Sequence, residues 1–562
     1  MSSHHPKQKS GKLWFFVTPL LLTALFLIAS AVGRAETAIN VGGPIFSNTT
    51  WTLANSPYLA TNSVQVMNGA TLTIQPGVVV KFAAGKALSI SGGLIARGTA
   101  NSPITFTSNS LSPQPGDWGF IKFENSSIDA TFDGDGNYTG GSIIQHAVVE
   151  YTGSDSNNWA AIYADGASPL IDSTAVRHGT GSGIYLVSSS SSLTNNTVTN
   201  NGGTGIYLNS SASRLTNNTV TNNGGTGIYG YDAASLVRGN TVAYNQVGID
   251  LYGNSNVPAT IEQNVIRNNY SSGVSCTYAL LQQNAIYRNG GIGVNLSSYC
   301  SALRNIVAYN LGGGINASSG GDSAIQHNKV AHNSNQGATG GIVGYYGVDI
   351  AYNSLVFNSS ETGSVAASMG YCASGSGYGG GFTYNTVVGQ TGNGVTDNTG
   401  GVFFDSYTIG CPFHHNNLYG NHGYEFYNYN AQSEGTLDAQ MNWWGTTDDS
   451  VINSEIYDFF DDGSLAVTNY GNFLLVPDTD APPAPPTGLQ VVVNGSAFNL
   501  GWNANTEADI EGYRVYYDID SGYPYSGTGA TQGASGIDVG NVTSFSLGGL
   551  PANKDIYFAV LA

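Results

Sequence analysis

Charge is what this 562-residue sequence has least of, because only 9% of its residues are Asp, Glu, Lys or Arg. The 36 acidic residues outnumber the 17 basic ones, which gives a formal net charge of −19. A surface of this sign repels phosphate backbones and anionic membranes. We therefore expect no nucleic-acid partner.

Long apolar runs are absent after the first 35 residues. Residues 1–35 carry three lysines, a charge-free and mostly apolar run from Leu13 to Val32, and a small-residue exit that ends at Ala35. This pattern is typical of a secretory signal peptide cleaved after Ala35. The alternative is an uncleaved anchor, because the run is almost long enough to span a membrane. We expect a secreted or cell-surface protein that has no membrane association after cleavage.

What the sequence has in quantity is a short repeat, Asn-x-(Val/Ile)-x-x-Asn followed by Gly-(Ile/Val). The repeat begins at Asn196, Asn218, Asn240, Asn264, Asn284 and Asn305. A period of 20–24 residues predicts a solenoid, in which each repeat buries its apolar face against its neighbours. Because the apolar pieces are short and β-branched, with no helical periodicity, each turn must be built from strands. We expect the asparagines to stack along the solenoid in a structural role.

These motifs resemble the right-handed parallel β-helix repeat family of secreted bacterial proteins, within the pectate-lyase-like superfamily. The resemblance implies an all-β chain with a right-handed parallel β-helix over residues 36–476. It implies little about function, because this scaffold carries lyases, hydrolases, adhesins and proteins of other roles.

The C-terminal part differs in composition from the repeats. Residues 477–486 form a Pro-rich linker, which predicts a domain boundary. Residues 487–562 alternate apolar and polar side chains and resemble a fibronectin type III β-sandwich, with Trp502 and Tyr513 as core aromatics. One strand of such a domain is missing from the sequence, so we expect a partial sandwich.

The four cysteines are Cys276, Cys300, Cys372 and Cys411. Two of them each follow another cysteine by about one repeat, and export permits disulfide bonds. We expect Cys276 to pair with Cys300, and Cys372 with Cys411, with free buried thiols as the alternative. Metal binding by these residues is disfavoured because no Cys-x-x-Cys spacing exists.

One segment has oxygen side chains at alternate positions around glycines, as calcium loops do. These are Asp133, Asp135 and Asn137. The glutamate that closes a calcium loop is missing, and Ile144 stands in its place. We interpret the segment as a surface insertion loop, with calcium as the alternative and the one cofactor considered.

A column of tyrosines follows the inward Ile of successive repeats, at Tyr163, Tyr185, Tyr207 and Tyr229, and Asp250 takes the next place. Because strand side chains alternate, these residues should point outward in one row. Such a row suits stacking on sugar rings, and it equally suits a self-stabilising aromatic ladder.

A second column, in an outward or turn position, lies two residues after the Val or Ile of the first motif. An ordinary solvated face is its favoured interpretation, and a groove that binds a linear glycan is the alternative. The column reads Tyr151, His178, Asn200, Asn222, Tyr244, Asn268, Arg288, Tyr309 and His332.

Residues for catalysis are few, since the sequence shows no nucleophile motif, phosphate loop or tight acidic pair. The leading hypothesis is therefore a non-catalytic protein that binds an extracellular or cell-wall polysaccharide, or acts as a surface adhesin. The first alternative is a polysaccharide lyase or glycoside hydrolase, with its site between Tyr229 and His332 or under the loops after Gly363. The second is a structural spacer that displays other domains.

Overall fold

The computed structural model describes residues 38–153, 160–317, 323–337, 339–360, 366–371, 380–392, 400–520, 525–551 and 553–562. Residues from Ala38 onward belong to one compact unit. The predicted signal peptide lies outside the described residues. Within those ranges no helix is both long enough and apolar enough to cross a membrane.

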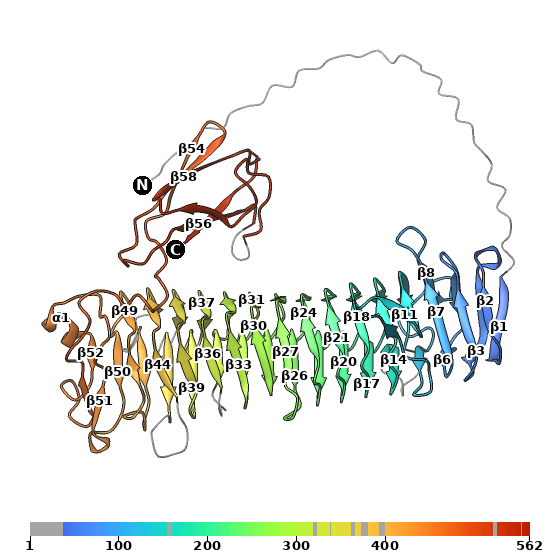
Figure 1. The fold of residues 1–562 in the computed structure, drawn as a ribbon, viewed down its shortest axis with the longest axis horizontal. Helices are drawn as coiled ribbons and strands as arrows, with labels where there is room; N and C mark the ends of the chain where they lie inside the picture. Colours follow the sequence, from blue (N-terminus) through green and yellow to red (C-terminus); the bar gives the residue numbers. More distant parts are fainter. Residues whose placement is uncertain are drawn as a thin grey trace, which may run out of the picture. The chain divides into compact units, whose positions relative to one another are not determined.

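The chain from residue 39 winds into parallel coils, and each regular coil contributes one strand to each of three faces (Figure 1). Face 1 contains β6 (Leu88–Ile90), β9 (Ile121–Phe123), β14 (Ala160–Asp165), β17 (Ser182–Val187), β20 (Ile206–Asn209), β23 (Ile228–Tyr231), β26 (Ile249–Tyr252), β29 (Val274–Thr277), β32 (Val294–Leu296), β35 (Ile315–Ala317), β39 (Ile342–Tyr345), β43 (Ala367–Gly370), β47 (Val402–Phe404), β50 (Phe426–Asn428) and β52 (Ile456–Tyr457).

Face 2 is a 15-stranded parallel sheet within the described residues. It contains β2 (Thr49–Trp51), β4 (Thr71–Ile74), β7 (Gly93–Arg97), β12 (Ile143–Gln145), β15 (Leu170–Asp172), β18 (Ser192–Thr194), β21 (Arg214–Thr216), β24 (Leu236–Arg238), β27 (Ala259–Glu262), β30 (Ala279–Gln282), β33 (Cys300–Leu303), β36 (Ala324–Gln326), β40 (Asp349–Ala351), β44 (Gly381–Thr383) and β48 (Phe413–His414).

Face 3 follows face 2 along each coil, and from β15 onward the corner between them has two residues. It contains β5 (Val79–Phe82), β8 (Ile104–Ser108), β13 (Ala147–Glu150), β16 (Ala175–Arg177), β19 (Thr197–Thr199), β22 (Thr219–Thr221), β25 (Thr241–Ala243), β28 (Val265–Arg267), β31 (Ala285–Tyr287), β34 (Ile306–Ala308), β37 (Lys329–Ala331), β41 (Ser354–Val356), β45 (Thr386–Val388) and β49 (Asn417–Tyr419). β1 (Ile39–Ile45) and β3 (Tyr58–Val66) begin both face 1 and face 3.

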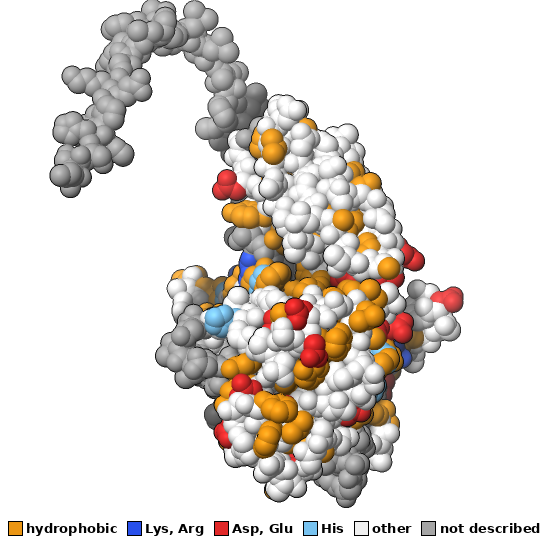
Figure 2. Space-filling view, turned by 90° about the vertical axis from the view of Figure 1, so that its left-hand side faces the viewer, with side chains coloured by type: hydrophobic (Ala, Val, Ile, Leu, Met, Phe, Trp, Pro, Cys, Tyr) orange, Lys and Arg blue, Asp and Glu red, His pale blue; other side chains and the backbone are white. Residues whose placement is uncertain are grey.

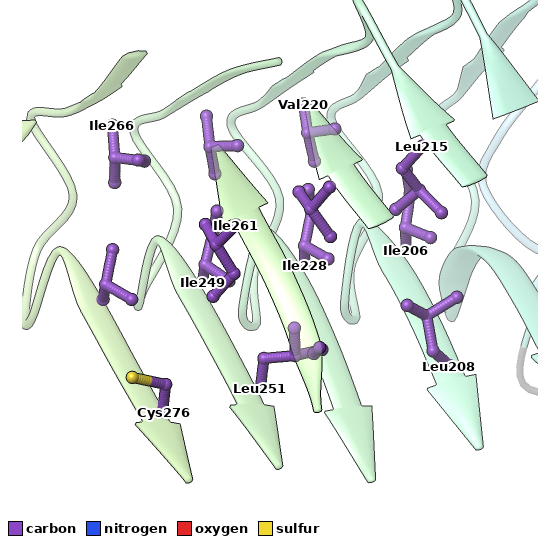
Figure 3. Packing of buried hydrophobic residues seen from close by; sticks show 14 of the residues in the cluster. Ile206, Leu208, Leu215, Val220, Ile228, Ile249, Leu251, Ile261, Ile266 and Cys276 are labelled. Carbon is purple, nitrogen blue, oxygen red and sulfur yellow. The ribbon is translucent and has the colours of Figure 1, made fainter. Parts of the chain in front are cut away.

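The interior is a continuous column of apolar side chains, which are aliphatic in the central coils (Figure 3) and include aromatic rings in the first and last coils. In one coil Ile206 and Leu208 point inward from face 1, Leu215 from face 2 and Val220 from face 3, and all four are fully buried. The outward neighbours of these residues are polar or aromatic, so each coil buries its apolar face only against the coils beside it.

Two ladders of buried asparagines run along the corners at the two ends of the face 3 strands, and they confirm the structural role predicted for the repeat. In the first ladder each side-chain amide donates to the next side-chain oxygen, at 2.9–3.3 Å, through Asn196, Asn218, Asn240, Asn264, Asn284, Asn305, Asn328, Asn353, Asn385, Asn416 and Asn442. The second ladder runs through Asn201, Asn223, Asn245, Asn269, Asn289, Asn310, Asn333 and Asn358.

The glycine of the second motif is required by the close approach of adjacent coils. A Cβ added at Gly205 would lie 2.4 Å from Cγ1 of Val220 and 2.6 Å from the carbonyl oxygen of Gly227. Neither contact is sterically possible, so only glycine fits at the start of the face 1 strand.

The last coil is covered by a closing segment, as the sequence predicts. Trp444 is buried, Asn442 ends the first ladder, and the short helix α1 (Asp449–Ser454) buries Ile452 against this end. β51 (Thr436–Asp438) and β53 (Val467–Asn469) pair beside it. The helix was not predicted, because six residues are too few to show a helical period.

Short pairs lie outside the three faces. β10 (Thr131–Phe132) and β11 (Tyr138–Gly140) form a hairpin, and β38 (Ser334–Asn335), β42 (Ser359–Ser360) and β46 (Thr391–Gly392) form a small parallel sheet. Two single 3-10 turns are η1 (Leu53–Asn55) and η2 (Gln432–Glu434).

Residues 490–561 form two three-stranded antiparallel sheets around their own core. The strands are β54 (Gln490–Asn494), β55 (Ala497–Gly501), β56 (Tyr513–Asp518), β57 (Ile537–Gly540), β58 (Ser544–Gly548) and β59 (Tyr557–Leu561). Trp502 and Tyr513 are buried in that core, with ring centroids 5.6 Å apart. The assignment to the fibronectin type III class stays a prediction.

Replacing one ladder amide should destabilise the coils around it. Asn245→Ala removes the oxygen that accepts from the backbone and side-chain nitrogens of Asn223, and it removes the donor to the Val220 carbonyl. Each buried group left unpaired costs about 1–3 kcal/mol. Amide hydrogen exchange of the flanking coils should speed up, whereas Thr219→Ala on the solvent side of the same face should change it little. If amide hydrogen exchange is equally fast in the two variants, the asparagine ladder does not stabilise the coils.

The second ladder ends on a buried acid, which predicts a dependence of stability on pH. Asn358 donates to Gln390, Gln390 to Asn421, and Asn421 to the carboxylate of Glu425. Burial raises the pKa of Glu425 from 4.5 to about 7, against the lowering effect of the hydrogen bonds from Asn421. Because the folded state holds this proton more tightly than the unfolded state, the free energy of unfolding should fall as pH rises from 4.5 to about 7.

The size of that fall should be on the order of 3 kcal/mol. Glu425→Gln keeps the shape of the side chain without its charge, so it should remove this part of the pH dependence. Thermal unfolding of both proteins between those pH values measures the difference. If stability changes with pH in the same way in both proteins, Glu425 does not titrate in this range.

Candidate functional site

The predicted tyrosine column exists and lies on face 1. Strand pairing places Tyr163 beside Tyr185, Tyr185 beside Tyr207, and Tyr207 beside Tyr229, and Asp250 takes the next place. Each tyrosine follows a fully buried Ile in its strand and is itself half-buried. The alternation of the β-strand therefore sets the outward direction of the whole row.

The four rings pack on one another along the solenoid axis. Their centroids are 5.2, 4.5 and 4.8 Å apart, and the angles between ring planes are 25°, 61° and 49°. Tyr163 and Tyr185 are stacked, whereas Tyr207 meets Tyr185 edge-on and Tyr229 is tilted against Tyr207, so the rings are in contact but do not form one flat stack. The self-stabilising ladder is thus a real part of what these residues do.

A basic group ends the row on the N-terminal side. Lys122 pairs in register with Tyr163, and its ammonium lies 5.3 Å from the Tyr163 ring centroid. The same ammonium contacts Glu124 at 2.8 Å and Asp165 at 3.4 Å. This end carries a net negative charge, because two carboxylates surround the single cation.

Asp250 ends the row on the other side and is the least satisfied group in it. Its Oδ1 atom is buried and accepts no hydrogen bond from the described residues. Burial raises the pKa of this carboxyl group above its ordinary value. The residue as a whole is only half-buried, so its carboxylate group stands beside the tyrosine rings as a hydrogen-bond acceptor for hydroxyl groups.

Two exposed tyrosines stand beside Asp250, and the sequence interpretation missed them. Tyr231 and Tyr252 lie two residues beyond Tyr229 and Asp250 in their strands, so they point outward in the adjacent row, with 58% and 42% of their surface exposed. Tyr252 lies 6.3 Å from Tyr229 between ring centroids. The pattern Ile-x-x-Tyr, which occurs in two successive repeats, could have predicted both residues from the sequence.

The second predicted column forms a corner of the solenoid rather than a strand face. All nine residues, from Tyr151 to His332, have left-handed backbones with φ between 53° and 64°. Those from Asn200 onward stand directly before the asparagines of the second ladder. Aromatic members stack where they are adjacent, as Tyr309 and His332 do at 4.8 Å. The solvated-face interpretation stays a prediction.

The basic residues near this region already have partners. Arg238 lies 2.6 Å from Glu262, and Arg177 lies 2.8 Å from Glu150. The Arg267 guanidinium lies over the ring of Tyr244, 5.7 Å from its centroid. None of these arginines is on the strand face that carries the tyrosine column.

The predicted calcium segment forms the turn of the β10–β11 hairpin. The Asp133 carboxylate accepts hydrogen bonds from the backbone nitrogens of Asp135 and Asn137 and from the Asn137 side chain. These bonds lower the pKa of Asp133. The insertion-loop interpretation thus accounts for the turn, and calcium binding there stays a prediction. No cluster of three His, Cys, Asp or Glu residues suited to a metal occurs in the described ranges.

The cysteines staple adjacent coils. Cys276 and Cys300 form a disulfide bond, with Cα atoms 6.2 Å apart, as their spacing of about one repeat predicts. Cys411 is buried and disulfide-bonded. Cys372, its expected partner, and residues 361–365 of the loop after Ser360 lie outside the described residues.

Comparison with protein families finds one matching model, described as the right handed beta helix region. It matches residues 52–242, 160–301 and 226–391, which together span more than half of the chain.

Solved structures give weaker matches. The periplasmic alginate epimerase AlgG is 12% identical, with 68% of this chain and 81% of that chain covered and a TM-score of 0.34. The A-module of the Azotobacter vinelandii mannuronan C-5 epimerase AlgE6 is 14% identical, with 64% and 92% covered and a TM-score of 0.32. A mutant tailspike protein of E. coli bacteriophage HK620, in complex with a pentasaccharide, is 11% identical, with 89% and 86% covered and a TM-score of 0.26. These values support no functional conclusion.

Among curated proteins, the Drosophila melanogaster protein bark beetle is 46% identical over 69 residues. The match covers 12% of this chain and 2% of the length of that protein.

The electrostatic coupling between Asp250 and its neighbours can be measured. The Asp250 carboxylate is the largest cause of the raised pKa of Tyr252. Asp250→Asn should therefore lower the pKa of Tyr252 and, to a lesser degree, that of Tyr229. Tyr207 is the internal control, because burial and Tyr185 cause its raised pKa. NMR titration of labelled tyrosines measures the three pKa values. An unchanged pKa of Tyr252 would show that the Asp250 carboxylate does not lie close to it.

Proposed function

Because the chain belongs to the right-handed β-helix family, we propose that it is an extracytoplasmic solenoid that binds polysaccharide along face 1 without degrading it. The observation that carries the proposal is the row Tyr163, Tyr185, Tyr207 and Tyr229, which ends at Asp250 beside the exposed rings of Tyr231 and Tyr252.

Physical chemistry supports a sugar ligand at this place. A polysaccharide carries hydroxyl groups, which hydrogen-bond to phenol hydroxyls and carboxylates, and apolar ring faces, which pack on tyrosine. The row is held by the solenoid before any ligand arrives, so little conformational entropy is lost on binding. The exposed rings of Tyr231 and Tyr252 supply further stacking surface beside the row.

An extracytoplasmic location is supported by the N-terminal sequence pattern and by the disulfide between Cys276 and Cys300. The two antiparallel sheets of residues 490–561, with Trp502 and Tyr513 in their core, support a fibronectin type III-like sandwich after the linker. Such modules commonly act as spacers, which is consistent with a surface adhesin.

A polysaccharide lyase or glycoside hydrolase is the second candidate, and Asp250 is the observation that favours it. A partly desolvated acid with a raised pKa is what general acid catalysis needs. Hydrolysis also requires a second carboxylate across the bond, and the outward neighbours of Asp250 on face 1 are Tyr229 and Ser275. Binding without cleavage therefore fits the site better.

One assay separates these functions. Residues 36–562 are incubated with neutral and acidic polysaccharides plus calcium, and both retention on the polymer and new reducing or unsaturated ends are followed. We expect retention without new ends. New ends would replace the binding proposal with an enzyme, and the absence of both signals would favour a structural spacer.

The triple change of Tyr185, Tyr207 and Tyr229 to Ala should weaken retention at least about tenfold, which corresponds to roughly 1.4 kcal/mol. The control is the triple change of Thr197, Thr219 and Thr241 to Ala, which are outward residues of the same three coils on face 3. Unchanged retention in the tyrosine variant, with circular dichroism like the wild type, would reduce the row to a structural ladder.

A further inference from the structure

A second aromatic surface lies on the C-terminal coils, outside the tyrosine row. We call it the C-terminal aromatic surface, and its members are Tyr346, Tyr371, Tyr407, Phe403, Tyr427 and Tyr429. The first three occupy a corner just after the face 1 strands, and the last three lie on or beside face 1 itself.

The corner residues form an exposed stack. Ring centroids of Tyr346 and Tyr371 are 5.2 Å apart, and those of Tyr371 and Tyr407 are 5.4 Å apart. Between 40% and 56% of the surface of each side chain is exposed. All three have left-handed backbones, with φ between 56° and 63°.

The backbone does not demand aromatic residues at this corner. In earlier coils the same corner holds Ser188, Ser210 and Asp232, also with positive φ. Asparagine, aspartate and glycine adopt this conformation more readily than tyrosine does. Coils between these hold Tyr278 and Tyr299 there, also with positive φ and with ring centroids 5.2 Å apart, so tyrosine is tolerated at this corner, and the third ring of the Tyr346, Tyr371 and Tyr407 stack sets that stack apart.

A fixed carboxylate stands between the two groups of rings. The Tyr345 ring lies over Gly370, where a Cβ would meet it at 2.4 Å, and its hydroxyl reaches Ser368 at 3.3 Å and Asp405 at 3.4 Å. Phe403 contacts Tyr427 and the half-exposed Tyr429, with centroids 5.4 and 5.8 Å away. Hydrogen-bonding groups thus lie on the same coils as the rings.

The charge around this surface excludes anionic ligands. The sequence contains no lysine or arginine between Lys329 and Arg514. Asp405 and Glu434 border the corner stack, where Glu434 accepts a hydrogen bond from the Tyr407 backbone nitrogen. Figure 2, which faces the C-terminal end of the coils, shows orange hydrophobic side chains and red carboxylates there, with blue side chains only at the margin. A polymer that carries carboxylate or sulfate groups is repelled here.

We propose that the C-terminal aromatic surface binds an uncharged glycan. Exposed tyrosine rings supply apolar contact, phenol groups donate and accept hydrogen bonds with sugar hydroxyls, and the Asp405 carboxylate accepts them. The repeat of these groups along the coils suits a linear polymer better than a folded protein. The proposal takes its ligand class from the proposed function, and it adds a second location and a preference for uncharged chains.

The test uses residues 36–562 in native gels that contain hydroxyethylcellulose, glucomannan, chitosan or alginate. The variant carries Tyr346→Asn, Tyr371→Asn and Tyr407→Asn, which suit the left-handed backbone. The matched control carries Tyr352→Asn and Tyr384→Asn, a stacked pair at another corner whose rings are 4.9 Å apart. We expect retardation by a neutral glycan, weakened at least about tenfold in the variant and unchanged in the control.

Other outcomes overturn the proposal. If alginate retards the protein as much as the neutral glycans do, the surface has no preference for uncharged chains. Retardation by chitosan alone, lost at about 0.5 M salt, would show an electrostatic surface for cations, including basic proteins. Equal losses in variant and control would indicate general destabilisation of corners. The two sites are distinguished by the tyrosine-row variant, because loss of binding only in that variant leaves the proposed function intact and refutes this second site.

Discussion

The structure depends on hydrogen bonding between successive coils. Each strand is three to six residues long in the regular region, and its backbone groups find partners only in the coils above and below. The asparagine ladders extend the same rule to the corners, where backbone groups would otherwise be buried without partners. Side chains that point inward or sit in a ladder are therefore fixed by the fold, and freedom to vary is confined to outward strand positions and corners.

That restriction explains why aromatic residues form columns. At parallel-strand spacing of about 4.8 Å, outward side chains in successive coils are in contact, and flat rings fill that distance well. The stacked pairs at three corners, for example Tyr352 with Tyr384, show that stacking stabilises corners in general. A functional assignment therefore needs more than a column. It needs rings that are exposed to solvent, or a polar group without a partner beside them.

The sequence was sufficient for the repeat, the inward residues, the ladders and the Cys276–Cys300 disulfide, because each depends on spacing along one coil. The same spacing placed Tyr163 to Asp250 in one row. Repeat spacing did not predict the C-terminal aromatic surface. The coil length grows there from 23 residues to 32, which obscures the alignment of Tyr346, Tyr371 and Tyr407. Solvent exposure and the unpartnered oxygen of Asp250 depend on the sizes of neighbouring side chains in three dimensions. The loss of lysine and arginine after Lys329, in contrast, was readable from sequence and was overlooked.

Both aromatic regions belong to face 1, and strand pairing defines what lies between them. From Asp250 the same outward row continues through Ser275, Asn295, Asn316, Val343 and Ser368, all small and polar except Val343, before aromatic residues return at Phe403. Seven coil steps separate Tyr229 from Phe403, which is roughly 34 Å at parallel-strand spacing. A ligand of one or two sugar units reaches only one region, whereas a polymer that follows the small polar residues reaches both. Contact at two places on a rigid scaffold raises the effective concentration at the second place once the first is bound. The arrangement therefore favours long chains over short oligosaccharides, even if each aromatic region alone binds weakly.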